Sequence, residues 1–249
     1  MSRAVAVVPG PTVDVLAAGE FMSEVLARVE RTVLDQIAGE LEAKHQLFSR
    51  LLADGRARSL DAAGAREVLR AIFATRRRAD GIVAELGPER LAHAVAELLD
   101  GEGPLAARFA EFDERLSPVA DAAFDLPGEL LHFTYPDRYW LWTRWMWDPR
   151  IETGSLRLVT SEELDLTAEG RGEGYLRVGQ AVALVHEMGR AGGFVTGEEL
   201  FGTDVFLACV YAIYMYTVLR MRMTQEFNRI VPELPDLVRR LLGVRHLPR

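Results

Sequence analysis

The chain has 249 residues, of which 49% are hydrophobic, and it carries a formal net charge of -8. A chain of this length buries most of its unfolded surface and needs no disulfide or structural metal to fold. Its ordinary apolar and charged fractions exclude wholesale disorder. The acidic balance argues against a general nucleic-acid-binding role, because the phosphate backbone favours basic surfaces. Lys44 is the single lysine among 29 basic residues, which indicates a GC-rich, bacterial genome.

Three short features bear on where the protein resides. The N-terminal apolar run, from Ala4 to Val8, is too short for the core of a signal peptide. The uncharged run at residues 205–219 is shorter than the roughly 20 residues that a membrane span needs, so we expect a core helix that is apolar on all sides. Cys209 lies inside this run, and we expect it to be a buried, unreactive thiol. These features predict a cytoplasmic protein without a membrane span.

Helical periodicity dominates the first half of the chain. Apolar residues recur every four positions along residues 13–52 and predict one long helix. Its buried stripe is expected to contain Val25, Val29, Val33, Ile37 and Leu41. A second helix is predicted over residues 61–86, capped by Asp61 and burying Val68, Leu69, Ile72 and Phe73. Two more helices are expected at residues 88–99 and 104–116, each opened by a proline.

The middle of the chain departs from this pattern. All four tryptophans lie within residues 124–150, and a short strand is predicted at residues 156–159. Gly170, Gly172 and Gly174 alternate with charged residues and indicate a flexible acidic loop. Helical periodicity then returns, with helices expected at residues 175–190, 204–229 and 236–242.

These elements predict an all-α protein, a multi-helix bundle of about seven or eight helices with a long irregular aromatic and acidic excursion in its middle. Residues 1–12 are expected to form an irregular N-terminal arm, followed by a single helical domain over residues 13–249. Within that domain we distinguish an N-terminal bundle (13–123), the aromatic and Gly/acidic excursion (124–174) and the C-terminal helices (175–249).

The aromatic excursion contains the strongest compositional signal, with seven aromatic residues between positions 133 and 147. Such a cluster either fills a junction between helices or forms a binding surface, where tryptophan, tyrosine and arginine act as anchors. We expect a mixture, with Trp140 buried and Trp145 or Trp147 accessible beside Arg144 and Arg150. The candidate partner-binding residues are Tyr135, Arg138, Tyr139, Trp142, Arg144, Trp145 and Trp147.

Part of this segment resembles a known bacterial sequence pattern. Leu130-Leu-His-Phe followed by Pro-Asp-Arg-Tyr-x-Leu-Trp is similar to a helix–turn segment of assorted bacterial proteins, some of them helical domains linked to restriction or phage-defence ATPases. The resemblance covers residues 130–142 only. The chain then continues into Trp145-Met-Trp147 in place of a polar Asn/Asp-rich stretch, and the resemblance assigns no functional residue.

Two Glu-x-x-His pairs offer an alternative based on metal chemistry. Glu42 with His45, and Glu129 with His132, would each place a carboxylate and an imidazole on one helix face. Two such pairs are typical of di-iron or di-manganese carboxylate bundles. Lys44 within the first pair argues against this site, so it stays an alternative. Its candidate ligands are Glu42, His45, Glu129, His132, His186 and Glu187.

The leading functional hypothesis is a non-enzymatic accessory or interaction protein that presents the aromatic segment to a protein partner or a small ligand. It requires no cofactor, and its partner is another protein or a second copy of the chain. One alternative is the metal-dependent helical enzyme or carrier. The other is a nucleic-acid-associated defence or regulatory module that would use Arg76–Arg78 and the arginine-rich tail at residues 220–249.

Overall fold

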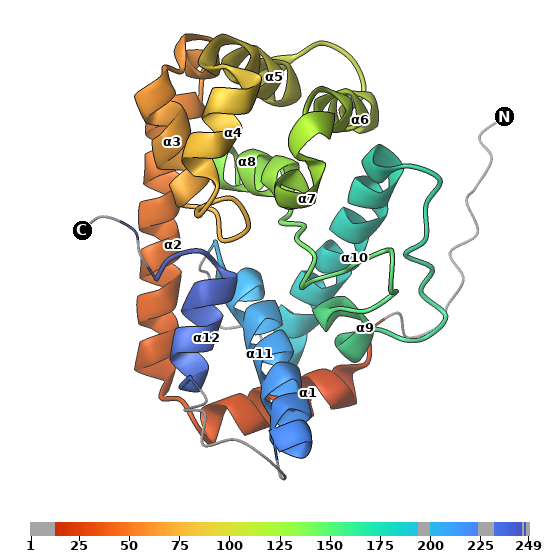
Figure 1. The fold of residues 1–249 in the computed structure, drawn as a ribbon. Coiled ribbons are helices and arrows are strands. Elements are labelled where there is room, and N and C mark those ends of the chain that lie inside the picture. Colours follow the sequence, from red (N-terminus) through yellow and green to blue (C-terminus); the bar gives the residue numbers. More distant parts are fainter. Residues whose placement is uncertain (1–12, 194–199, 224–231, 246, 248–249) are drawn as a thin grey trace, which may run out of the picture.

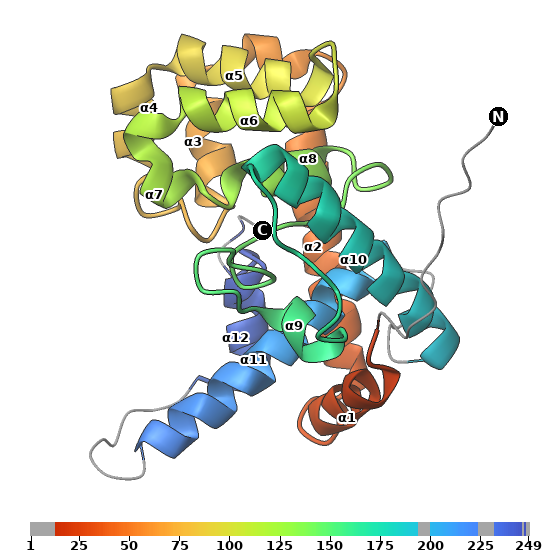
Figure 2. The same ribbon diagram turned by 90° about the vertical axis from the view of Figure 1, so that its right-hand side faces the viewer.

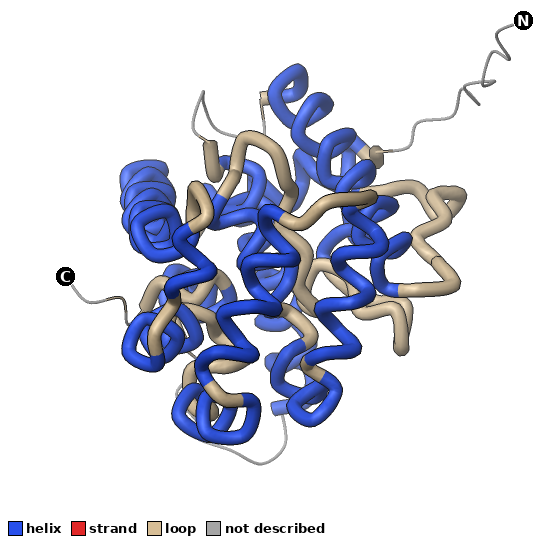
Figure 3. The backbone as a smooth tube through the Cα atoms, turned by 90° about the horizontal axis from the view of Figure 1, so that it is seen from above, coloured by secondary structure: helices blue, strands red, loops and turns tan. Residues whose placement is uncertain are grey.

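The computed structural model describes residues 13–193, 200–223, 232–245 and 247, so the predicted N-terminal arm lies outside the described residues. Within these ranges every regular element is helical (Figure 3). Extended pairing there is limited to isolated bridges between Val13 and Thr160 and between Asp148 and Thr153. The predicted all-helical class is therefore confirmed.

The first predicted helix is two helices, α1 (Val15–Leu26) and α2 (Arg31–Leu52). Asp14 caps α1, because its carboxylate accepts a hydrogen bond from the Ala17 N–H at 2.9 Å. A stripe repeated every four residues drifts about 40° per step around a helix, so it cannot face one core over residues 13–52. The chain turns between the two helices, and Val33 is only partly buried whereas Ile37 is fully buried.

The second predicted helix is also broken, into α3 (Ala62–Arg70) and α4 (Ala79–Leu86). The predicted cap is confirmed, since Asp61 accepts from the Gly64 N–H at 2.7 Å. In the break, the buried Thr75 hydroxyl donates to the Leu69 carbonyl at 2.7 Å. Phe73 lies in this break and is 42% exposed, so its predicted burial is wrong. Arg76–Arg78 likewise lie in the break and not along a helix.

The proline and glycine residues correctly predict where the next two helices begin. Pro88 occupies the first turn of α5 (Pro88–Asp100), and Pro104 precedes α6 (Leu105–Arg115). Phe109 and Phe112 on α6 are buried as predicted. Shorter elements complete this region: the 3₁₀ helices η1 (Arg56–Ser59) and η2 (Ser117–Val119), and the helices α7 (Ala120–Ala123) and α8 (Leu126–Thr134).

The segment predicted as a strand is the short helix α9 (Ser155–Val159), which buries Leu156 and Val159. The following helix, α10 (Arg171–Gly192), begins four residues before the predicted start at residue 175. A Cβ atom at Gly172 would lie 1.9 Å from the Ala106 carbonyl oxygen. Gly172 therefore lets α6 and α10 touch backbone to backbone, and the predicted flexible loop at residues 170–174 is instead largely the start of a packed helix.

The apolar run forms α11 (Gly202–Met223), which is followed by α12 (Leu234–Leu241). Every residue from Phe201 to Val210 is buried, but Tyr214 is 38% exposed. Figure 2 shows the C-terminal part of α11 extending away from the other helices, so the helix is a core helix over its first half only. No helix among the described residues is long and apolar enough to cross a membrane.

Cys209 lies in the buried half of α11. Its side chain is 1% exposed, and burial raises the pKa of its thiol to about 12. A buried thiol with a raised pKa provides little thiolate for reaction. The prediction of a buried cysteine is confirmed.

The helices gather in two groups joined by α2 and α10 (Figure 1). Helices α3 to α6 lie at one end, whereas α1, α9, α11 and α12 lie at the other. Helix α2 contacts α8, α11 and α12, and α10 contacts α6 and α1. The described helices outnumber the seven or eight predicted, because two long predictions divide and short helices form where an irregular excursion was expected.

Candidate functional site

The aromatic segment has two parts with opposite surroundings. We call residues 135–140 the aromatic turn and residues 141–147 the tryptophan loop. In the loop, Trp142, Trp145 and Trp147 are at most 7% exposed. In the turn, Trp140 is half-buried. The prediction of a buried Trp140 with an accessible Trp145 or Trp147 is therefore wrong.

Packing from several helices seals the tryptophan loop. The Trp142 ring stacks on Phe109 of α6 at 6.0 Å between centroids and meets the edge of Phe124 at 5.4 Å. Its indole N–H donates to the Trp147 carbonyl at 2.9 Å. A Cβ atom at Gly128 would lie 2.3 Å from the Trp142 carbonyl oxygen. The loop backbone thus passes directly over α8, and glycine is required at that crossing.

The remaining indoles are held in the same way. Trp145 lies 6.3 Å from the Tyr211 ring of α11, and Trp147 lies beneath the Arg157 guanidinium. Arg144, a candidate partner-binding residue, contacts Asp125 twice: its backbone N–H donates to the carboxylate at 2.8 Å, and its guanidinium Nε lies 3.7 Å from the same oxygen. These contacts indicate that the tryptophan loop fills a junction between helices.

Beneath the aromatic turn lies a group of four buried titratable side chains, which we call the polar core: Lys44, Glu129, His132 and Asp204. None of the four is more than 2% exposed. The Lys44 ammonium donates to the Glu129 carboxylate at 2.5 Å and to the Leu242 carbonyl at 2.8 Å. His132 Nε2 lies 2.9 Å from Asp204 Oδ2. The polar core therefore links α2, α8, α11 and the end of α12.

The polar core shifts the titration of its members. Burial lowers the pKa of Lys44, and it raises the pKa of Glu129 to about 7 against the opposing effect of the Lys44 ammonium. Burial alone would lower the pKa of His132, but the Asp204 carboxylate outweighs it and the pKa is raised. A buried charge needs a partner of opposite sign, and both cations have one.

Phe133 contributes a third kind of contact to this cluster. The Lys44 ammonium lies 4.1 Å from the centroid of the Phe133 ring. A cation over an aromatic face is attracted by the ring quadrupole, and the attraction grows when water is excluded. The single lysine of the chain is therefore held by a carboxylate, a carbonyl and a ring.

The polar core also holds the backbone of the aromatic turn. His132 Nδ1–H donates to the Tyr139 carbonyl at 2.7 Å. The Tyr175 hydroxyl, on α10, donates to the Trp140 carbonyl at 2.8 Å. Burial raises the pKa of Tyr175, so its phenol keeps the proton that it donates. Two successive carbonyls of the turn are thus fixed from below by buried donors.

The start of the turn is fixed by a separate network. The Tyr135 hydroxyl donates to Asp100 at 3.0 Å and accepts from the Asp54 N–H at 3.0 Å. The Arg138 guanidinium lies over the Tyr135 ring at 5.0 Å, and its side chain is 64% exposed. The turn is therefore held at its start through the Tyr135 side chain and at its end through the Tyr139 and Trp140 carbonyls, and it presents aromatic and cationic groups between them.

The six candidate metal ligands are placed as follows. Glu129 and His132 share α8 and belong to the polar core. His45 lies nearby, but its Nδ1–H donates to the Phe133 carbonyl at 2.9 Å. His186 Nδ1 lies 2.8 Å from the Thr203 hydroxyl, and Glu187 is exposed. Glu42 accepts from Gln46 at 3.3 Å. The described part of the chain contains no group of three or more His, Cys, Asp or Glu side chains that could hold a metal ion.

Sequence reasoning missed Lys44 and Asp204 as members of the polar core. Lys44 carried one available signal, since it is the single lysine in a chain that uses arginine elsewhere. Asp204 directly precedes the uncharged run at residues 205–219 and lies in the first turn of α11. Its pairing with His132 spans 72 positions, which no local pattern shows.

Comparisons of the chain with known protein families, curated proteins and solved structures found no match.

Proposed function

We propose that this chain is a non-enzymatic interaction protein that binds a protein partner through the aromatic turn. The observation that carries the proposal is the pair of buried donors, His132 and Tyr175, on the successive carbonyls of Tyr139 and Trp140. A surface segment ordered before binding loses little conformational entropy when a partner arrives. The turn therefore has the property that a specific docking site needs.

The side chains of the turn support this proposal. Tyrosine, tryptophan and arginine dominate binding energy at protein interfaces, because they combine a large rigid contact area with a polar group. Tyr135, Tyr139 and Trp140 are all half-buried, with one part supported and another part open. Arg138 adds an exposed cation over an aromatic ring. A partner that offers a carboxylate beside an apolar side chain would suit this combination.

The burial of the tryptophan loop reduces the number of residues that we propose contact the partner. Trp142, Trp145 and Trp147 contact other parts of the same chain and leave the proposed contact set. Tyr135, Arg138 and Tyr139 stay in it, and Trp140 joins them. The polar core acts as the support of this surface, since its groups are sealed from solvent and paired with one another.

A site-specific photo-cross-linker tests the proposal. It would replace Arg138 in the full chain, in cells that produce the protein naturally, with Arg77 as the matched control because that arginine is also exposed. We expect position 138 to capture one discrete protein or a second copy of the chain, identified by mass spectrometry. Tyr139→Ala should abolish that capture without changing the melting temperature by more than a few degrees.

Two outcomes would count against the aromatic turn. Equal capture from positions 138 and 77 would show that contact there is not specific. Capture at position 138 that survives Tyr139→Ala would show that the aromatic side chains do not contribute to binding.

A further inference from the structure

A hollow of about 250 Å³ lies between the end of α4, the first half of α5 and the end of α6. Its apolar lining consists of Leu86, Leu91, Ala94 and Leu116, each no more than 4% exposed. Its polar lining consists of Arg90, His93 and Arg115. We call this hollow the basic pocket. It has the combination of an apolar interior and a few polar groups that ligand sites share.

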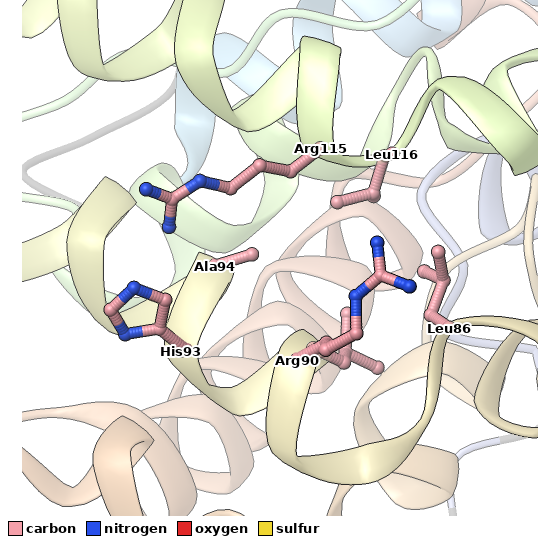
Figure 4. A pocket seen from close by; sticks show the side chains of 7 residues that line it. Leu86, Arg90, His93, Ala94, Arg115 and Leu116 are labelled. Atoms are coloured by element: carbon pink, nitrogen blue, oxygen red, sulfur yellow. The ribbon is translucent and has the colours of Figure 1, made fainter.

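Three basic side chains line this pocket. Figure 4 shows Arg115, from the end of α6, extending toward His93 on one side of the pocket, and the Arg90 guanidinium, from α5, on the other side beside Leu86 and Leu116. Arg90 and His93 are both exposed, and neither belongs to an ion pair among the described residues. This local excess of positive charge contrasts with the net charge of -8 on the whole chain.

Arg115 has a donor group that the described part of the protein does not satisfy. One of its terminal nitrogens pairs with Glu111, one turn earlier on α6. Its Nη1 is buried and has no hydrogen-bond partner among the described residues. Buried donors in proteins are almost always hydrogen-bonded, so Arg115 Nη1 retains the capacity to donate to one more acceptor. Arginine is suited to the planar oxygens of carboxylates and phosphates.

We propose that the basic pocket binds a small amphiphilic oxyanion, a carboxylate or phosphate monoester attached to a short apolar or aromatic group. Arg115 Nη1, with His93 beside it, and the Arg90 guanidinium across the pocket hold the oxyanion between them, and the leucine and alanine side chains take the apolar part. A dry cavity of roughly 150 Å³ can hold a benzene ring, so this pocket has room for a ring and its acidic group. This binding site goes beyond the proposed docking turn.

Calorimetric titration of the full chain tests the pocket, with phenyl phosphate and benzoate as probes. We expect at least one of them to bind saturably, and Arg90→Ala and Arg115→Ala each to weaken it by about tenfold or more. Arg77→Ala is the matched control and should leave binding unchanged. Arg90 is exposed, and the Arg115 side chain is 32% exposed and paired with Glu111, so loss of either charge should have little effect on folding. Circular dichroism of both variants would verify this.

Two further probes test the amphiphilic character. Inorganic phosphate lacks the apolar group and benzyl alcohol lacks the charge, so each should bind more weakly than the full probe. The proposal is overturned if neither phenyl phosphate nor benzoate binds saturably, or if Arg90→Ala and Arg115→Ala bind as the control does. Equal binding of inorganic phosphate and phenyl phosphate would overturn the role of the apolar interior.

Discussion

The aromatic turn and the tryptophan loop follow each other directly in the sequence and are both rich in aromatic residues, yet they have different surroundings. The loop packs its indoles against α6, α10 and α11, and its backbone crosses α8 at Gly128. The turn keeps its side chains half open and is held through its backbone carbonyls. A high density of aromatic residues therefore does not by itself distinguish a buried segment from a partly exposed one. In this protein the partly exposed half is the one whose backbone carbonyls accept from buried side-chain donors.

The difference also separates two sources of stability. The tryptophan loop depends on apolar burial, which is proportional to the area removed from water. The aromatic turn depends on the polar core. The polar core stabilises the fold only while its charges are paired, because an unpaired buried charge is strongly destabilising. Removing one member of the polar core and removing one indole of the loop should thus destabilise the protein for different reasons.

The largest effect is expected at Lys44. Lys44→Met should lower the free energy of unfolding by about 3–5 kcal/mol, because it leaves the Glu129 carboxylate and the Leu242 carbonyl without their buried donor. Chemical denaturation measures this loss as a shift of the unfolding midpoint at constant slope.

A double variant provides the control for Lys44. Lys44→Met combined with Glu129→Met removes both charges and should recover a large part of the loss, since apolar pairs of similar volume often replace buried ion pairs without penalty. Recovery should stay incomplete, because the Leu242 carbonyl still lacks a donor. A single variant as stable as the wild type would show that the pair contributes nothing to folding.

The next largest effect is the loss of stability on replacing a tryptophan, which should differ between the tryptophan loop and the aromatic turn. Trp147→Ala should cost about 3–5 kcal/mol, because it empties a site that is 1% exposed. Trp140→Ala should cost about 1 kcal/mol, since that ring is half open and rests mainly on His186. Denaturation of the two variants side by side measures the difference. Equal losses would contradict the division of the aromatic segment at residue 140.

Much of the fold could be predicted from local pattern. Apolar periodicity, proline at first turns and the Asp61 cap predicted most of the helices. The 40° drift of a four-residue stripe already indicates that the first predicted helix must break. The positions of the breaks, at residues 27–30 and 71–78, could not be predicted, because they depend on tertiary packing. The segment Leu156-Arg-Leu-Val159 is short and β-branched at its end, but it forms a short helix that buries Leu156 and Val159, three positions apart on one face.

The candidate site was predictable only in part. The Glu-x-x-His spacing correctly places Glu129 and His132 together on α8, yet their partners are 85 and 72 residues away along the chain. Those pairings depend on how α2 and α11 pack against α8. The exposure of the four tryptophans could not be predicted either, because sequence proximity to arginine does not show whether a ring faces solvent.

Quenching of tryptophan fluorescence by acrylamide, a neutral solute, tests most directly the division of the aromatic segment. The native protein should contain one accessible indole, Trp140, and three protected ones. Trp140→Phe should therefore remove most of the quenching in the native state, whereas all three remaining indoles should become accessible in denaturant. Strong native quenching that persists in Trp140→Phe would place an indole of the tryptophan loop at the surface and contradict the account.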